Sequence, residues 1–451
     1  MVYYKPGTQA QYLSGVVTVL GKKHEPKPDF LNDKLESAYA WYIELRGKLI
    51  SRARAEAIRR GESVKDAAEP IRKILLMAIC VYLFSLGTTE AMFERCMLLV
   101  LYHSIGRAGE VSTMNFDLLS WCPDTESLWT KWQQTKTGRA APVSYHADAT
   151  SWKKCMLHAF ACYFVTTTGL DSTDGWLFPS LAGLTSEGGA ASKTNRLLEK
   201  LVGKVLGLTK KHTSHGLRAG AADDLAFDNN VNIVSLILRG DWDWTGECQV
   251  FGYLTKKKHV ASGGKSLADY PNPGMHASAP RLTSIVDGAD EEDAGLLDRF
   301  VKQLFKFAPA IFMVGLVGFR DAMVAVLLMY FDDMVNEVPD PKKNCVLRKM
   351  KDSIHRSGGT SSDLSRWGTI IREEFQLRNA VNLSKAPQDD NRLAGAVVKL
   401  TENLIAQKET AKKQEAHNEK QEEHIKKQEE HIKLQAEHIK LQAEHIKLQA
   451  E

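Results

Sequence analysis

The chain has few of the features that mark secreted, disulfide-linked or metal-binding proteins. Its seven cysteines are scattered along the sequence, and none forms a CxxC pair. The N-terminal sequence MVYYKPGTQA lacks the charged and apolar regions of a signal peptide. These absences predict an intracellular protein in a reducing compartment. His212 and His215 have no third ligand at zinc spacing, so no metal or other cofactor is expected.

The chain also has only a small excess of positive charge and few long apolar runs. The formal net charge is only +4, which is mild for a DNA-binding protein. Residues 307–331 form the longest apolar run, but Arg320 and Asp321 interrupt it where a charge would be costly in lipid. This run predicts two buried helical segments, and we expect no membrane partner. The shorter apolar stretch 73–86 predicts a core helix.

What is present indicates a folded, mainly α chain with a small β-sheet near residues 110–145. The length of 451 residues suggests about three domains. Changes in composition predict five segments: a short helical segment 1–68, a mostly helical unit 69–260, a Gly-, Pro- and Ser-rich linker 261–290, a helical region 291–384 without a functional motif, and a helical tail 385–451.

The most informative pattern is an ordered set of basic residues followed by a tyrosine: Arg107, Lys136, His215, Arg218 and Tyr253. Two guanidinium groups can bind the charged oxygens of a phosphate transition state without a metal ion. A lysine or histidine can protonate the leaving 5′-oxygen, and an activated tyrosine hydroxyl can form a covalent phosphoryl intermediate. The set therefore predicts chemistry on a phosphodiester.

These residues lie in four segments that resemble the tyrosine recombinase (integrase) family: HSIGRAGEVSTMNF, WQQTKTGRAAPVSYH, SHGLRAGAADDLA and RGDWDWTGECQVFGYL. The resemblance implies that Glu110 is the acidic neighbour of the first arginine. It also implies that a tryptophan precedes the nucleophile, and both Trp242 and Trp244 are candidates. Arg218 follows Arg107 by 111 residues and precedes the tyrosine by 35. The likeness ends near residue 260.

The resemblance implies a recombinase-like catalytic domain at 69–260 that cuts and rejoins double-stranded DNA through a 3′-phosphotyrosine link. Such enzymes need neither a metal ion nor ATP, and they act as a tetrameric synapse. The segments SHGLRAGAADDLA and RGDWDW are most similar to eukaryotic mobile-element (Crypton-type) members, which implies a nuclear location in a eukaryotic host and a cytoplasmic one otherwise. Residues 1–68 are then either a reduced core-binding domain or a basic amphipathic helix that packs on the catalytic domain.

Three other functions remain open. The first is a type IB topoisomerase or telomere resolvase with the same chemistry. The second is a catalytically inactive descendant that binds DNA and self-associates. The third is a structural coiled-coil protein with a helical head.

The tail is a seven-residue repeat with isoleucine at one position. This period places Ile425, Ile432, Ile439 and Ile446 along one side of a helix. The second apolar position of each heptad is filled by glutamate or alanine, so the buried stripe is narrow. The repeat predicts a helix that either dimerises as a coiled coil or remains solvated.

Overall fold

The computed structural model divides the chain into two compact units, Met1–Ala68 and Glu69–Glu451. Only residues 48, 51, 52, 55 and 59 of the first unit are described. The elements and contacts below all belong to the second unit. Lys136, Trp244, Tyr253 and the heptad tail lie outside the described residues. The described ranges are 69–131, 142–168, 175–182, 187–206, 211–242, 256–287, 290–306 and 315–380, with the single residues 170 and 208.

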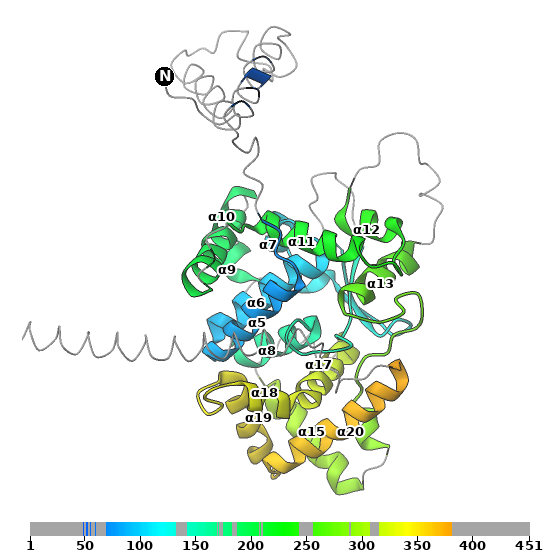
Figure 1. Ribbon diagram of the computed structural model, residues 1–451. Coiled ribbons are helices and arrows are strands. Elements are labelled where there is room, and N and C mark those ends of the chain that lie inside the picture. Colours follow the sequence, from blue (N-terminus) through cyan, green and yellow to red (C-terminus); the bar gives the residue numbers. More distant parts are fainter. Residues whose placement is uncertain are drawn as a thin grey trace, which may run out of the picture. The chain divides into compact units, whose positions relative to one another are not determined.

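The second unit is mainly helical, with one small sheet, as the sequence predicted. In Figure 1, α5, α6 and α8 lie between α10–α12 on one side and the C-terminal helices α15–α20 on the other. The strands are β1 (Leu119–Cys122), β2 (Ser127–Lys131) and β3 (Pro142–Tyr145). The helices are α5 (Lys73–Leu86), α6 (Thr89–Ser104), α7 (Ala108–Ser112), α8 (Met156–Thr166), α9 (Pro179–Ala182), α10 (Glu187–Leu198), α11 (Ser214–Ala226), α12 (Ile233–Gly240), α13 (Lys256–Leu267), α14 (Thr283–Val286), α15 (Glu291–Leu304), α17 (Val317–Met329), α18 (Phe331–Glu337), α19 (Cys345–Arg356) and α20 (Ser361–Asn379).

The sheet is antiparallel in the order β1-β2-β3. Leu119 pairs with Thr130, and Leu128 pairs with Tyr145. Leu128 and Tyr145 are fully buried, so one face of the sheet belongs to the core. In β3, the consecutive residues Val143, Ser144 and Tyr145 are all buried, so both faces of this strand are covered.

The expected core helix at 73–86 is confirmed as α5, whose central residues are buried. It ends at Gly87, which has a φ of 64°. A Cβ at this position would lie 2.8 Å from the Asn344 Cα, so only glycine fits the turn. Asn344 Nδ2 donates to the Phe84 carbonyl at 2.8 Å, and Cys345 N donates to the Gly87 carbonyl at 3.0 Å. The end of α5 is thus joined to the start of α19.

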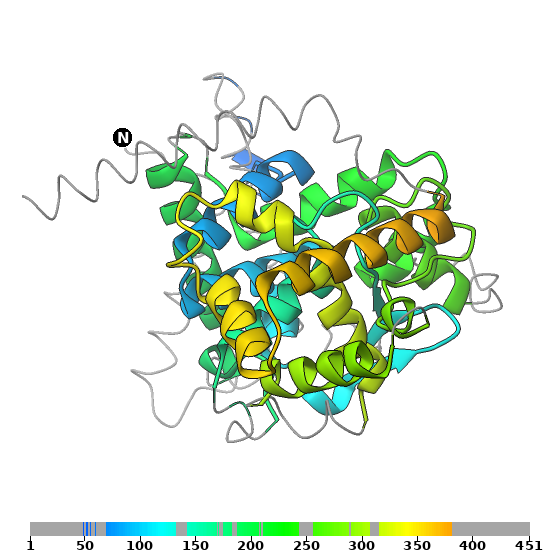
Figure 2. The same ribbon diagram turned by 90° about the horizontal axis from the view of Figure 1, so that it is seen from below.

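The C-terminal helices share this core rather than forming a separate region. Phe319 of α17 packs edge-on against Phe160 and Phe164 of α8. Gly368 of α20 lies directly against the Leu328 backbone, where any larger residue would collide with the carbonyl. Figure 2 shows α20, in orange, crossing the other C-terminal helices. Residues 290–306 and 315–380 therefore belong to the same packed unit as the predicted catalytic domain.

The apolar run that raised the membrane question contributes α17. Its residues from Ala322 to Met329 are buried in the protein, and Arg320 pairs with Asp321 at 2.7 Å. Among the described residues, no helix is long and apolar enough to cross a membrane.

The segment 261–290, predicted as a linker, begins with the last part of α13 and includes α14, while residues 268–282 form no helix or strand. α13 runs through Leu267, and Val260 and Ala261 are buried. Gly264 lies against Ser144 of β3, with no space for a side chain. Small residues permit this close approach of helix and strand. At Gly264, the small residue serves this close packing of α13 against β3.

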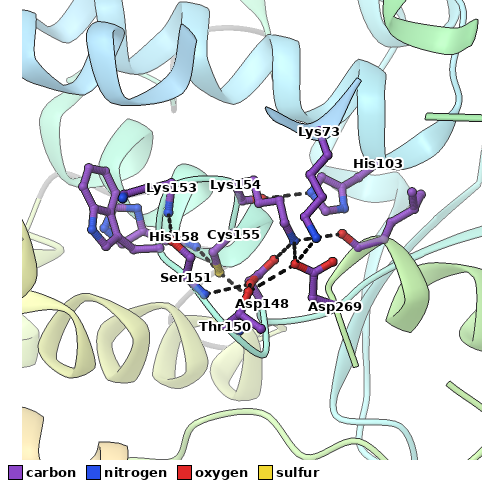
Figure 3. Close-up of polar contacts among 12 residues, drawn as sticks. Lys73, His103, Asp148, Thr150, Ser151, Lys153, Lys154, Cys155, His158 and Asp269 are labelled. Carbon is purple, nitrogen blue, oxygen red and sulfur yellow. Dashed lines mark hydrogen bonds and ion pairs between the residues drawn. The ribbon is translucent and has the colours of Figure 1, made fainter. Parts of the chain in front are cut away.

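A buried ionic cluster ties three distant segments together (Figure 3). Lys154, before α8, is paired with Asp148 and lies 3.0 Å from Asp269, which follows α13. Asp269 also pairs with Lys73 at the start of α5, at 2.5 Å. Burial alone would lower the pKa of Lys154, but Asp148 and Asp269 together raise it above its ordinary value. The lysine is therefore charged within the core.

Replacing Lys154 by methionine is expected to lower the free energy of unfolding by about 3–5 kcal/mol, because Asp148 would remain buried without a counter-charge. Equilibrium urea denaturation measures the change. Lys153→Met is the matched control: Lys153 pairs with Glu337 near the surface at 3.2 Å, and its loss should cost about 1 kcal/mol or less. Adding Asp148→Asn to Lys154→Met should recover part of the loss. If the double variant loses as much stability as Lys154→Met alone, the unpaired charge of Asp148 is not the cause of the loss.

Three histidines are buried in their neutral form: His103, His146 and His158. Burial lowers the pKa of all three, and that of His103 falls to about 3, helped by the charge of Lys154. Arg95 Nη1 donates to His158 Nδ1 at 3.1 Å, so this nitrogen must be unprotonated.

Acidification is therefore expected to destabilise the fold. An unfolded histidine has a pKa of about 6.5, above the folded value, so the stabilisation is complete above about pH 6.5 and is lost as the pH falls toward 3. Each histidine contributes about 1.4 kcal/mol per pH unit in this interval. Urea unfolding at several pH values measures the slope. His158→Gln should reduce that slope by about 1.4 kcal/mol per pH unit, the contribution of one proton. An unchanged slope would contradict the conclusion that His158 is buried in its neutral form.

Candidate active site

Four of the residues singled out in the sequence line one pocket of about 510 Å³. They are Arg107, His215, Arg218 and Trp242, which come from three separate stretches of the chain. The pocket lies where α7, α10 and α11 meet the end of α12. These helices are in the upper part of Figure 1. The remaining lining residues are Gly106, Ala108, Gly109, Ala191 and Ser214.

Arg107 is placed by the turn between α6 and α7. Ile105 adopts a left-handed conformation (φ 51°) that ends α6. Such a conformation is strained for a β-branched residue and is found mainly where the surrounding structure enforces it. Glu110 is buried and accepts from Arg107 twice, from the backbone N at 2.7 Å and from Nη1 at 2.5 Å. Glu110 therefore holds Arg107 in place, as expected for its acidic neighbour.

His215 and Arg218 lie near the start of α11, as the sequence predicted. Thr213 caps the helix by accepting from Gly216 N at 3.4 Å. The two side chains are three residues apart and share one face, with His215 exposed and Arg218 largely buried.

The opposite face of α11 is fixed by the chain segment that leads into α5. Ile71 N donates to the Gly216 carbonyl at 2.8 Å. Gly220 lies against the Ile71 carbonyl with no room for a side chain. The helix that carries His215 and Arg218 is therefore fixed from behind by glycine contacts.

Arg218 is held by the ends of two helices. Nη1 donates to the carbonyl of Ile105 after α6, and Nη2 donates to the carbonyl of Gly240 at the end of α12. Helix C-termini carry partial negative charge, which favours a cation there. Burial, followed by the nearby charge of Arg107, lowers the pKa of Arg218 to about 10. The guanidinium stays charged at neutral pH, and an anion between the two arginines would relieve their mutual repulsion.

Trp242 closes one side of the pocket. Its ring lies 5.0 Å from the guanidinium carbon of Arg218, in cation–π contact. A Cβ on Gly240 would lie 2.5 Å from the indole, so a larger residue there would displace the ring from this position. Trp244, the alternative candidate, lies outside the described residues.

Sequence reasoning missed two residues that shape the site. Asp241 ends α12, and its Oδ2 lies 3.7 Å from Arg107 Nη1. Arg239 is buried and donates to the carbonyls of His103 at 2.6 Å and Ser144 at 2.7 Å, which holds α12 against α6 and the sheet. A charged residue inside the apolar segment IVSLILRG was the only available signal for Arg239.

The described residues contain no group of three His, Cys, Asp or Glu side chains that could hold a metal ion. His212 is buried, and its Nδ1 lies 3.2 Å from the Glu69 carbonyl, whereas His215 lines the pocket. The two histidines therefore have different surroundings. His212 is packed inside the protein and does not line the pocket.

No protein-family model, curated protein or solved structure matches this chain.

Proposed function

We propose that this protein is a DNA strand-transferase of the tyrosine recombinase type, which cuts and rejoins DNA through a 3′-phosphotyrosine intermediate. The observation that carries the proposal is the pocket itself. It gathers two arginines, a histidine and a tryptophan from three separate stretches of the chain, and their chemistry fits one reaction. Arg107 and Arg218 would bind the non-bridging oxygens of the scissile phosphate.

In the proposed reaction, the hydroxyl oxygen of Tyr253 attacks the phosphorus and the bond to the 5′-oxygen breaks. The phenolic proton passes to a base, for which His215 is the candidate that the pocket presents. The leaving 5′-oxygen takes a proton from Lys136. The phosphodiester energy is kept in the tyrosine link, so the 5′-hydroxyl of another strand can reverse the step.

Chain length is compatible with Tyr253 reaching this pocket. Trp242 lines the pocket, and the tyrosine follows it by eleven residues. An extended chain spans about 3.3–3.6 Å per residue, or roughly 35 Å over this interval. We propose double-stranded DNA as the partner, a tetrameric synapse as the active assembly, and a nuclear location in a eukaryotic host or a cytoplasmic one otherwise.

Covalent trapping tests the proposal. The protein is incubated with a pool of duplexes of randomised sequence, each with one nicked strand. The position of the nick varies across the pool, so that some nicks lie close to a cleavage site. After cleavage, the short fragment that bears the 5′-hydroxyl diffuses away, so rejoining fails and the protein–DNA adduct accumulates on a denaturing gel. An adduct that forms in excess EDTA and without nucleotide supports the proposal, while an absolute need for magnesium contradicts it.

The other outcomes separate the alternatives. Relaxation of supercoiled DNA without recombinant products indicates a type IB topoisomerase. DNA binding without an adduct indicates an inactive descendant, and the absence of DNA affinity at low salt indicates a structural protein.

A further inference from the structure

Ser214 lines the pocket but has no part in the reaction proposed above. It begins α11, close to His215 and Arg218, and is partly exposed. Its backbone N donates to Asn195 Oδ1 of α10 at 2.7 Å, which fixes the start of α11 against the neighbouring helix. Its hydroxyl, by contrast, has no hydrogen-bond partner among the described residues. The side chain therefore brings an unused hydrogen-bond donor to the pocket.

Helical spacing places this hydroxyl on the same side of α11 as the buried arginine. Residues four apart on a helix are neighbours on one face, with Cβ atoms about 5–6 Å apart. Ser214 lies one turn before Arg218, and both line the pocket. Arg107 lines the same pocket from the turn before α7. We therefore expect a phosphate that binds both guanidinium groups to lie beside the Ser214 hydroxyl.

Both arginines already donate hydrogen bonds to the protein. A guanidinium group has five N–H donors. Arg218 directs two of them to the carbonyls of Ile105 and Gly240. Arg107 directs one of them, from Nη1, to Glu110 at 2.5 Å. The remaining donors have to serve both non-bridging oxygens of a phosphate, so a hydroxyl beside them would add a useful contact.

We propose that Ser214 is a third phosphate-binding residue, whose hydroxyl donates to a non-bridging oxygen of the phosphodiester held by Arg107 and Arg218. The inference rests on the proposed function, because it concerns the same phosphate site. Hydrogen bonds to an ionised group are roughly twice as strong as those between neutral groups. The bond strengthens as negative charge builds up on this oxygen during the attack by Tyr253, so Ser214 is a catalytic residue of the proposed reaction.

Ser214→Ala tests the contact, because removing the hydroxyl deprives no described residue of a hydrogen bond. The dissociation constant of dimethyl phosphate, a soluble phosphodiester, is measured by ligand-observed NMR on the full chain. We expect Ser214→Ala to weaken binding by about tenfold or more, the effect of one hydrogen bond to a charged group. Ser214→Thr keeps the hydroxyl and should bind dimethyl phosphate nearly as tightly as the unsubstituted protein.

Ser192→Ala is the matched control. Ser192 is an exposed serine of α10 that does not line the pocket, so its substitution should leave the dissociation constant unchanged. The melting temperature of each variant is measured as well, to separate effects on binding from effects on folding. Ser214→Ala should melt close to the unsubstituted protein, because its hydroxyl makes no hydrogen bond to the described part of the chain.

A second measurement uses the nicked duplexes described above. Ser214→Ala should slow formation of the covalent adduct by about tenfold or more at saturating protein, since one stabilising donor is lost while Tyr253 remains. Complete loss of the adduct in Ser214→Ala, with an adduct in Tyr253→Phe, would make the serine hydroxyl the nucleophile and overturn its role as a donor.

The remaining outcomes separate this inference from the proposed function. Unchanged binding of dimethyl phosphate in Ser214→Ala, or weaker binding that Ser214→Thr does not restore, would overturn the contact and leave the phosphate site in place. If dimethyl phosphate binds to none of the proteins, the phosphate site and the proposed function fail together. The expected binding pattern in a protein that forms no covalent DNA adduct would support the contact with Ser214 and contradict the strand-cleavage proposal alone.

Discussion

Tyr253→Phe is expected to abolish covalent attachment to DNA while leaving DNA affinity nearly unchanged. The substitution removes the oxygen that would attack the phosphorus and leaves the aromatic ring. The adduct is measured on denaturing gels with nicked DNA, and binding is measured by fluorescence anisotropy at a fixed salt concentration.

Tyr270→Phe is the matched control for this experiment. Tyr270 is buried, and its hydroxyl donates to the Ser278 carbonyl at 3.2 Å. Loss of that hydroxyl should leave adduct formation intact. An undiminished adduct in Tyr253→Phe would show that another residue attacks. A loss of adduct in Tyr270→Phe alone would move the nucleophile to that residue.

Arg218→Ala is expected to lower the rate of strand cleavage by on the order of a hundredfold or more. The guanidinium is preorganised by the carbonyls of Ile105 and Gly240, so it can stabilise the transition-state charge without reorganisation. We expect a similar loss for Arg107→Ala, because Glu110 preorganises that side chain in the same way. Single-turnover cleavage measures both effects.

The stability of each arginine variant has to be measured beside its rate. Arg218→Ala leaves the Ile105 and Gly240 carbonyls without their donor and should also lower the free energy of unfolding by about 1–3 kcal/mol. Arg95→Ala is the matched control, since Arg95 is a buried arginine that donates to the Trp152 carbonyl at 2.8 Å but does not line the pocket. It should reduce stability without a hundredfold loss of cleavage by the protein that remains folded. Equal loss of cleavage in both variants would show that folding, not phosphate binding, explains the effect.

Local patterns in the sequence predicted several elements correctly. The apolar stretch 73–86 is a core helix, and His215 and Arg218 lie near the start of α11, after the capping residue Thr213. These features depend on neighbouring residues: a helix cap acts over three residues, and a continuous apolar run is buried wherever it packs. Such signals can be read without knowledge of the fold.

Domain boundaries are harder to predict from composition. Glycine, alanine and serine are typical both of flexible linkers and of close contacts between packed elements. The sequence does not show that Gly264 lies against Ser144, 120 residues earlier in the chain. Its composition therefore predicts a linker at 261–290, although α13 (Lys256–Leu267) extends into this segment. The sequence also predicts residues 291–384 as a region apart from the catalytic unit. It does not show the contact of Phe319 with Phe160, because these two residues are far apart in the chain.

For the site itself, residue types, their order along the chain and the family resemblance were enough to single out two arginines, a histidine and a tryptophan as candidates. Their convergence in one pocket came from tertiary structure, because Arg218 is held by the carbonyl of a residue 113 positions earlier in the chain. Asp241 could not be found in the same way. Its carboxylate comes near Arg107 only because the fold brings the end of α12 beside that arginine, and contacts between distant segments leave no periodic or capping signal in a single sequence.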